Sequence, residues 1–182
     1  MDRPYPKDPL AELSEKVRVS GWTMRADAKL DFVHPPLNDL RDLWFAKSEA
    51  LGHMPRRADF DARSLKPFLR NLAIVERVVD EGRIRYRTRL HGSLLVQYFG
   101  EQTGKFLDQS IPPDVIESFH DGYDAVLQMR KPVRALSFYQ IPSVDYLAGE
   151  SFAVALGNEE DRPVQVLSAT YLTSKKIAAL KF

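Results

Sequence analysis

The chain has 182 residues, of which 26 are basic, 25 are acidic and 44% are hydrophobic. This length and balance are typical of one ordinary globular domain, which buries about 70% of its unfolded surface and needs no disulfide or metal. Because the sequence contains no cysteine, disulfides, thiolate zinc sites, iron–sulfur clusters, cysteine nucleophiles and flavin–cysteine photochemistry are excluded. The net charge of +1 also argues against a protein that binds nucleic acid through bulk positive charge.

The sequence carries no recognisable targeting or membrane segment. The N-terminus, from Met1 to Pro6, lacks the apolar core of a signal peptide. No apolar run approaches the roughly 18 residues that a membrane-spanning helix needs. We therefore expect a cytoplasmic protein that makes no contact with a membrane.

Residues 1–35 are predicted to form a partly helical N-terminal extension. Asp8 is a suitable N-cap, and Pro9 is a suitable first helical residue. The helix that follows has a narrow apolar stripe formed by Leu10, Leu13 and Val17. Because the extension has too few large apolar residues for a core of its own, this helix needs a surface on its own domain, a second copy or a partner.

The remaining sequence predicts short helices and strands. Helical periodicity covers 38–51, a shorter stretch at 61–70 and a long amphipathic stretch at 112–130, with short helical pieces over 93–110. Period-two alternation and β-branched residues predict five strands, at 72–79, 83–91, 133–141, 149–157 and 163–173. The first two strands form a hairpin around Asp80-Glu81-Gly82. Together these elements make a domain over 36–173, which a basic C-terminal tail over 174–182 follows.

The order of these elements predicts the fold class. Helices, a hairpin, further helices and a three-strand meander indicate an α+β fold with a five-stranded antiparallel sheet. We expect the helices to pack on one face of that sheet. Strands and helices do not alternate regularly, which argues against a doubly wound nucleotide-binding fold.

A family resemblance extends from Leu40 to Leu172. It rests on Trp44 and on four segments: Pro55 to Asp61, Tyr86 to Ser93, Phe99 to Gly104, and Tyr123 to Val133. In these residues and in the order of its elements the chain resembles PAS domains. More narrowly, it resembles a family of short bacterial single-domain PAS proteins of mostly unassigned function.

The resemblance implies a five-stranded sheet in which the first hairpin lies beside the last strand, with a small cavity between the sheet and the helices. It also implies a sensory or regulatory role in signal transduction rather than catalysis. PAS-like domains usually act beside an output domain, and the chain has no length left for one. We therefore expect the signal to leave through an unidentified signalling protein or through a homodimer formed by the N-terminal helix.

Aromatic and histidine side chains are the candidate ligand-binding residues. Strand parity and helix periodicity direct several of them between the sheet and the helices; the set comprises Tyr86, Tyr98, Phe99, Phe119, His120, Tyr123 and Phe138. Two interpretations remain open. Either these side chains fill a closed core, or they line a small-molecule pocket in which tyrosine hydroxyls are the polar anchors.

Four arginines alternate along the strand predicted at 83–91, and they are candidate anion-binding residues. Arg83, Arg85, Arg87 and Arg89 share one face, at a spacing of roughly 6.6–6.8 Å. One interpretation is a site for phosphate, nucleic acid or an acidic protein surface. The other is a solvated strand face whose arginines pair with carboxylates on neighbouring strands.

Histidines bear on cofactors and metals. His120 lies at the edge of the apolar arc of the long helix, where haem-binding PAS domains carry an iron ligand, so the resemblance offers haem as a cofactor. Glu117 and His120 form one Glu-x-x-His pair, whereas a di-iron site needs two. We predict no metal site and no catalytic residue. His34 lies beside a turn proline, and we expect it at the surface.

The sequence thus predicts a sensory domain without enzymatic activity, which binds a small ligand, a protein partner or both. Two alternatives remain open. One is a small α+β enzyme that uses the same cleft, and the other is an anion or nucleic-acid binder that uses the arginine strand.

Overall fold

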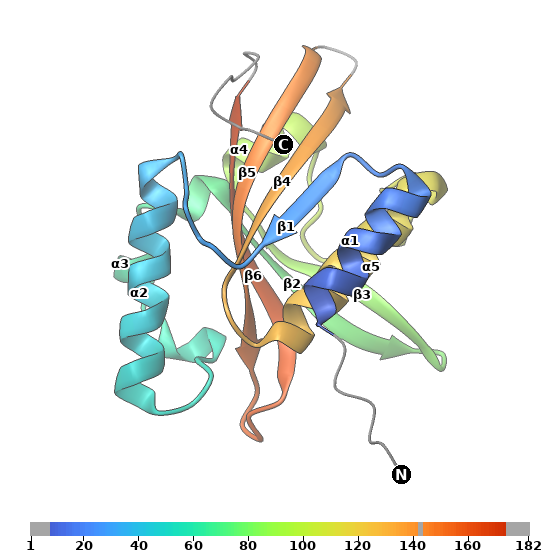
Figure 1. Ribbon diagram of the computed structural model, residues 1–182. Coiled ribbons are helices and arrows are strands. Elements are labelled where there is room, and N and C mark those ends of the chain that lie inside the picture. The colour runs from blue at the N-terminus through green and yellow to red at the C-terminus, as the bar shows by residue number, and fades with distance from the viewer. Residues whose placement is uncertain (1–7, 142–143, 174–182) are drawn as a thin grey trace.

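A six-stranded antiparallel sheet forms the centre of the computed structural model, which describes residues 8–141 and 144–173 (Figure 1). Across the sheet the strands follow the order β1-β4-β5-β6-β2-β3. Their bounds are Met24–Asp27 (β1), Leu72–Asp80 (β2), Arg83–His91 (β3), Val133–Ile141 (β4), Val144–Gly157 (β5) and Pro163–Thr173 (β6).

Five α-helices and three short 3-10 turns connect and cover the described strands. The helices are Pro9–Ser20 (α1), Pro35–Leu51 (α2), Ala62–Leu65 (α3), Ser93–Phe99 (α4) and Pro113–Met129 (α5). The 3-10 turns are Arg57–Asp59 (η1), Leu69–Asn71 (η2) and Leu107–Gln109 (η3). The predicted α+β class and the five predicted strands are confirmed. The predicted basic tail at 174–182 lies outside the described residues.

The prediction of five strands is one short, because the N-terminal segment adds β1 at the edge of the sheet. Its residues pair with β4, from Met24 opposite Ser137 to Asp27 opposite Arg134. A four-residue strand without alternation of apolar and polar side chains gives no period-two signal in the sequence. The strand forms because β4 otherwise leaves its outer N–H and C=O groups unpaired.

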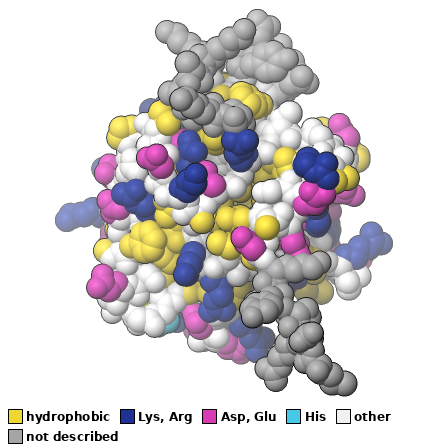
Figure 2. All heavy atoms as spheres, in the orientation of Figure 1, with side chains coloured by type: hydrophobic (Ala, Val, Ile, Leu, Met, Phe, Trp, Pro, Cys, Tyr) yellow, Lys and Arg dark blue, Asp and Glu magenta, His cyan; other side chains and the backbone are white. Residues whose placement is uncertain are grey.

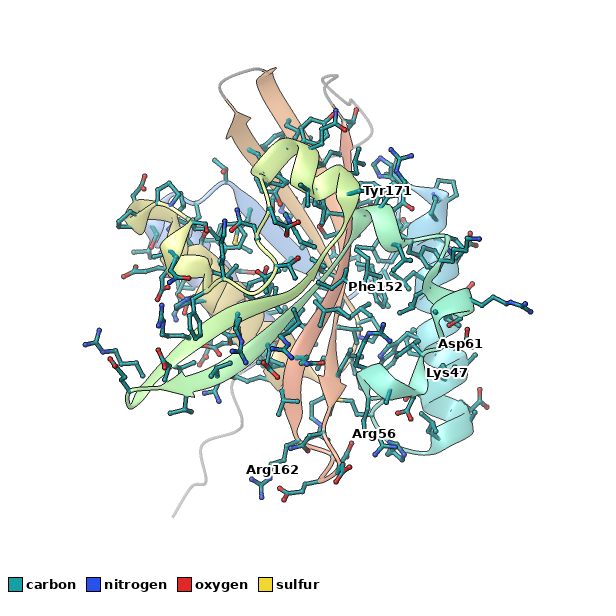
Figure 3. All side chains as sticks on the ribbon, turned by 180° about the vertical axis from the view of Figure 1, so that it is seen from behind. Lys47, Arg56, Asp61, Phe152, Arg162 and Tyr171 are labelled. Carbon is teal, nitrogen blue, oxygen red and sulfur yellow. The ribbon has the colours of Figure 1, made fainter. Side chains whose placement is uncertain are left out.

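Helices cover both faces of the sheet, so the expectation that they pack on one face is wrong. In β5, Phe152, Val154 and Leu156 belong to a core cluster with α2, whereas Ala153 and Ala155 belong to a cluster with α5. Figure 1 shows α2 on one side of the sheet and α5 on the other. Figure 3, from behind, shows Phe152 on the side of α2. The alanines are small but apolar, and they let a second helical layer pack against the opposite face.

The N-terminal helix packs on its own chain. Leu10 and Leu13 are buried, and α1 lies alongside α5 (Figure 1). The Asp8 carboxylate accepts a hydrogen bond from the Leu10 N–H at 3.0 Å, as the predicted N-cap requires. Lys16 Nζ lies 2.7 Å from the Asp121 carboxylate of α5. Residues 8–27 are therefore structurally continuous with the sheet and α5.

Gly92, between β3 and α4, permits a close approach between two backbones. A Cβ atom at this position would lie 2.3 Å from the Leu69 carbonyl oxygen and 2.5 Å from that of Arg70. The Gly92 N–H also donates to the Leu72 carbonyl at 2.8 Å. Only glycine fits here without displacing η2.

We expect Gly92→Ala to destabilise the domain by about 3 kcal/mol or more, because backbone atoms rather than a flexible side chain would have to move. Gly122→Ala in α5 is the control, since its Cβ would lie 3.5 Å from Met24 Cε, which is an ordinary contact. Alanine should stabilise that helix by roughly 1 kcal/mol. Urea unfolding of both variants measures these changes, and a Gly92→Ala protein as stable as the wild type would contradict the close approach.

Candidate functional site

Small hydroxyl side chains gather on the face of the sheet that α5 covers. By strand parity, Ser137, Ser151 and Thr170 lie on the same face as the α5-facing residues of β4, β5 and β6. Ser151 is opposite Thr170, and their hydroxyl oxygens are 2.8 Å apart. Ser168 lies two residues before Thr170 on the same face, and all four side chains are only half-buried. We call Ser137, Ser151, Ser168 and Thr170 the hydroxyl patch.

Aromatic rings from α4 and β4 lie beside this patch. The rings of Phe99 (α4) and Tyr139 (β4) meet edge to face with their centroids 5.1 Å apart. Gly149 makes room for Tyr139, because a Cβ atom there would lie 2.9 Å from the tyrosine ring. The missing side chain at Gly149 therefore brings an aromatic ring onto the surface of the sheet next to the hydroxyl patch.

A second aromatic group joins β3 to α5. The Tyr86 ring centroid lies 5.2 Å from His120 and 5.3 Å from Tyr123, and Phe119 lies 6.2 Å from Tyr123. These distances are typical of attractive contacts between aromatic rings. Because Tyr86 is buried and belongs to the sheet while the other three belong to α5, this cluster fixes the position of the helix on the sheet.

The tyrosine hydroxyls of both groups stay protonated. Burial raises the pKa of Tyr123, and the neighbouring Tyr139 raises it further. Burial also raises the pKa of Tyr139, and that of Tyr86, whose hydroxyl donates a hydrogen bond to the Asp124 carboxylate. Arg77 Nε lies 3.6 Å from the same carboxylate. These phenols are therefore neutral hydrogen-bond donors at physiological pH.

An open groove of about 430 Å³ lies beside the second aromatic group. It is lined by Asp80, Glu81, Arg83, Ile84, Arg85, Asp108 and His120. The His120 Nε2 atom is buried and has no hydrogen-bond partner among residues 8–141 and 144–173. A buried polar atom without a partner is costly, so this nitrogen is available to a bound group or a water molecule.

The structure brings most of the predicted ligand-binding residues together, but not all. Tyr86, Phe119, His120 and Tyr123 form one cluster, and Phe99 joins the hydroxyl patch through Tyr139. Tyr98 is half-buried on α4. Phe138 is 39% exposed and shares strand parity with Leu136 and Arg134, on the opposite face of the sheet. Phe138 therefore lies on the other face of the sheet from Tyr86 and Tyr123, and the prediction that it lines one pocket with them is wrong.

The arginine row of β3 is largely paired with carboxylates. Arg85 contacts Asp80 and Asp108, and Arg87 and Arg89 both contact Glu76. Arg85 also stacks its guanidinium 3.7 Å from the centre of the Phe106 ring. The pairing supports the interpretation of a solvated strand face. On the face drawn in Figure 2, basic and acidic side chains are likewise interspersed rather than gathered by sign.

A buried carboxylate on the other face was not recognised in the sequence. Glu150 of β5 is inaccessible to solvent, and it accepts hydrogen bonds from the backbone N–H groups of Val33 and His34 at 3.0 and 2.9 Å. His34 Nδ1 lies 2.6 Å from it, and Arg134 Nε donates to it at 2.8 Å. An acidic residue just before the apolar run from Phe152 to Leu156 is the signal that could have indicated such a site.

Glu150 connects the start of α2 to three strands. Arg134 of β4 also lies 3.4 Å from Asp27 of β1, and the His34 ring stacks on Tyr171 of β6 with centroids 5.6 Å apart. His34 is thus a partly buried partner of a carboxylate, and the expectation that it lies at the surface is wrong. The cluster has a structural role, because it anchors the segment before α2 to the sheet.

The chain is similar in fold to several solved structures. The chain is similar to a light-oxygen-voltage domain at 15% identity and a TM-score of 0.44, over 64% of this chain and 87% of that chain. It is also similar to a light-oxygen-voltage protein of Rhodobacter sphaeroides (13% identity, TM-score 0.42, 74% of this chain and 69% of that one). A sensory box sensor histidine kinase from Vibrio cholerae gives 14% identity and a TM-score of 0.40, over 80% and 99% of the two chains. No family model and no curated protein matches the chain.

The strand order decides the fold independently of these modest similarities. Without β1, the sheet runs β3-β2-β6-β5-β4, so the first hairpin lies directly beside the last strand. The helices α4 and α5 connect the hairpin to the final three strands. The fold is PAS-like. The sixth strand and the layer formed by α2 are additions to that PAS-like arrangement.

The surroundings of His120 do not fit haem. Its unpartnered Nε2 atom is the group that an iron ligand would use. However, the adjacent groove is lined by five charged side chains, whereas a porphyrin needs a largely apolar slot. The His120 ring is also packed against Tyr86. We therefore assign no haem to this PAS-like domain.

The Glu150 cluster predicts acid sensitivity. Burial alone would raise the pKa of Glu150, but hydrogen bonds from Val33, His34 and Arg134 outweigh burial and lower it below the ordinary 4.5. The carboxylate thus stabilises the fold above that ordinary pKa, and this stabilisation is lost as the pH falls through the lower pKa of the folded protein.

We expect Glu150→Gln to lower the free energy of unfolding at pH 7 by about 3–5 kcal/mol, since Arg134 loses its buried partner. The variant should also lose less stability than the wild type on acidification. Glu160→Gln, on the exposed hairpin between β5 and β6, is the control and should change stability by at most about 0.5 kcal/mol. Denaturant unfolding at several pH values measures both effects. Parallel stability curves for the wild type and Glu150→Gln would show that this carboxylate is not linked to pH.

Proposed function

We propose that this PAS-like domain is a sensory or regulatory module that binds a small ligand between the sheet and helices α4 and α5. In the proposal, its ligand state is passed on to a partner protein in the cytoplasm. The observation that carries the proposal is the hydroxyl patch, four half-buried serine and threonine side chains beside the half-buried rings of Phe99 and Tyr139. A closed core would place apolar side chains at these central positions of a sheet.

The chemistry of the site favours an uncharged ligand with hydrogen-bonding groups. Serine and threonine hydroxyls both donate and accept, while the buried phenols of Tyr123 and Tyr139 are neutral donors. The rings of Phe99 and Tyr139 offer a flat apolar surface beside these groups. Ligand sites of this kind combine aromatic walls with a few polar anchors.

A binding role accounts for the patch better than a catalytic one. The Ser151 hydroxyl lies 2.8 Å from the Thr170 hydroxyl, whereas a serine nucleophile needs a base such as histidine within this distance. The ion pairs of Arg85, Arg87 and Arg89 likewise weigh against the arginine row as a nucleic-acid site. Within the described residues, no helix is long and apolar enough to cross a membrane.

Native mass spectrometry and an absorbance spectrum of freshly purified protein test for the ligand. We expect a bound small molecule that the denatured protein releases. Ser151→Leu should abolish the bound mass, because the larger side chain would fill the space that the proposal gives to the ligand. Ser151→Ala removes the hydroxyl without filling that space, and it should weaken retention only partly.

Two outcomes would contradict the ligand proposal. One is wild-type protein that carries no ligand and gains none from a library of uncharged metabolites in a thermal-shift assay. The other is a ligand that Ser151→Leu retains as well as the wild type does, which would place the ligand elsewhere. Circular dichroism of each variant shows whether a loss of ligand merely reflects a loss of fold.

We also propose a homodimer in which α1 takes part, although Leu10 and Leu13 are already buried against the same chain. The contact then has to use the outer side of α1, where Val19 is 68% exposed. Light scattering at tens of micromolar should give twice the mass of the chain, and Val19→Asp should return it to the monomer. A wild-type monomer at this concentration rules the homodimer out.

A further inference from the structure

A short helical run before β2 exposes basic side chains. It covers residues 62–71 and consists of α3, a turn and η2. Backbone N–H groups in its second half donate to the carbonyl three residues earlier, from Phe68 to Leu65 at 3.0 Å and from Asn71 to Phe68 at 2.9 Å. In this geometry, side chains three positions apart lie one above another. The buried side of the run is accordingly formed by Leu65, Phe68 and Asn71.

An outward column of side chains consists of Arg63, Lys66 and Leu69, and Arg70 follows directly beside it. All four side chains are exposed, including that of Leu69 at 36%. Successive side chains of the column are about 6 Å apart, because a 3-10 helix rises about 2 Å per residue. We call Arg63, Lys66 and Arg70 the basic surface.

No acidic side chain pairs with the basic surface. From Ala62 to Val75 the sequence contains these three basic residues and no acidic one. Neither α4 nor β6, which pack against η2, carries an acidic residue. Within the part of the chain that the structure describes, none of the three basic side chains has an ion pair or a hydrogen bond. The Asp61 carboxylate accepts a hydrogen bond from the Ser64 N–H at 2.7 Å and lies close to Lys47 of α2 (Figure 3).

The basic surface differs in this respect from the arginine row of β3. Three of the four arginines in that row pair with carboxylates. On the basic surface, like charges lie close together without a counter-charge, and such charges repel each other. An anionic partner relieves this repulsion and accepts charge-assisted hydrogen bonds from the guanidinium groups. The basic surface is therefore better suited to an anionic partner than the row that the sequence singles out.

Two contacts hold the end of the basic surface in place. Asn71 Nδ2 donates to the Thr170 carbonyl of β6 at 2.9 Å. The carbonyl groups of Leu69 and Arg70 lie against Gly92, where a Cβ atom does not fit. A surface that is already ordered loses less conformational entropy when a partner binds. Gly92 also immediately precedes α4, so the basic surface is joined to a helix of the proposed ligand site.

We propose that the basic surface docks an acidic segment of the partner protein. Carboxylates of this segment pair with Arg63, Lys66 and Arg70, and an apolar side chain of the segment contacts Leu69. The exposed Leu69 and Pro67 favour a protein over a nucleic acid, because protein interfaces combine apolar contacts with charged groups. The net charge of +1 also gives a nucleic acid little long-range attraction.

A second copy of this chain fits the basic surface less well. In a two-fold symmetric dimer the same surface patch is present on both sides of the contact. The basic side chains of the two copies would then meet without an acidic side chain between them. A contact with an acidic face elsewhere on the chain would be head to tail, and such contacts build rings or filaments rather than dimers.

The inference rests on the proposed function for the existence of a partner, and it names the chemistry of that partner. The basic surface shares no residue with the hydroxyl patch, so the ligand assay and the peptide assay below fail independently. A ligand retained in native mass spectrometry without peptide binding rejects the basic surface alone. Peptide binding by a protein that carries and gains no ligand rejects the ligand site alone.

Fluorescence anisotropy with a labelled acidic peptide tests the docking surface. The peptide has blocked ends, and glutamate alternates with alanine around one central leucine. We expect saturable binding to the full chain at low ionic strength, and weaker binding as salt is added. The same peptide with glutamine in place of every glutamate should bind at least tenfold more weakly.

A triple charge reversal tests the surface from the side of the protein. The variant Arg63→Glu, Lys66→Glu, Arg70→Glu should bind the acidic peptide at least tenfold more weakly than the wild type. It should also bind the corresponding lysine peptide at least tenfold more tightly than the wild type does, because the sign of the surface is inverted.

The matched control carries three charge reversals on exposed cations elsewhere, which also have no ion pair in the described ranges: Lys29→Glu, Arg83→Glu and Lys131→Glu. This control changes the net charge by the same amount and should bind the acidic peptide within about threefold of the wild type. Circular dichroism and thermal unfolding check that both triple variants fold.

Several results would overturn the proposal. The wild type fails to bind the acidic peptide, or it binds the glutamine peptide equally well. The control variant loses as much binding as the variant of the basic surface. A labelled DNA duplex binds the wild type more tightly than the peptide does and is lost in that variant, which assigns the surface to nucleic acid. Light scattering shows a dimer that the variant dissociates, which assigns it to a second copy. If the triple variant does not fold, the three single reversals, each expected to weaken binding at least twofold, decide the question.

Discussion

The alternation of side-chain size along β5 organises the whole molecule. Its even-numbered residues from Phe152 to Leu156 are large and form a core with α2, whereas Ala153 and Ala155 let α5 lie close to the opposite face. A central strand with apolar side chains on both faces must be covered twice. The position of α5, and with it the aromatic contacts of Tyr86 and Tyr123, depends on this alternation.

The same strand also carries one polar side chain of interest on each face of the sheet. Glu150 faces α2 and binds the backbone at the start of that helix, while Ser151 faces α5 and contributes to the hydroxyl patch. Glu150 is fully buried and accepts four hydrogen bonds, whereas Ser151 is only half-buried. A buried charge with every partner in place stabilises one arrangement, whereas accessible hydroxyls leave hydrogen bonds for an incoming molecule.

Local patterns in the sequence predict most helices and strands well. The features that they miss depend on tertiary packing. The alternation of Arg83 to Leu90 and the caps of α1 locate β3 and α1 within a residue or two. The sequence does not reveal β1 because this strand forms only by pairing with the outer edge of β4. The position of α2 on the second face of the sheet likewise depends on its tertiary contacts with β5. In the site, helix periodicity finds Phe119 and Tyr123, but the hydroxyl patch and the Glu150 cluster need the register between strands. Phe138 shows the limit of strand parity. Parity tells which residues of a strand share a face, but it does not tell which helices cover that face.

The pairing of Gly104 and Lys105 with Thr88 joins two regions that are otherwise separate. This short segment lies between α4 and η3, so it belongs to the connection that leads into α5, and at the same time it covers the end of the exposed strand edge. The same segment continues along β3 through an antiparallel bridge between Arg87 and Phe106. The connection that leads into α5 therefore cannot leave the sheet without breaking its hydrogen bonds to β3.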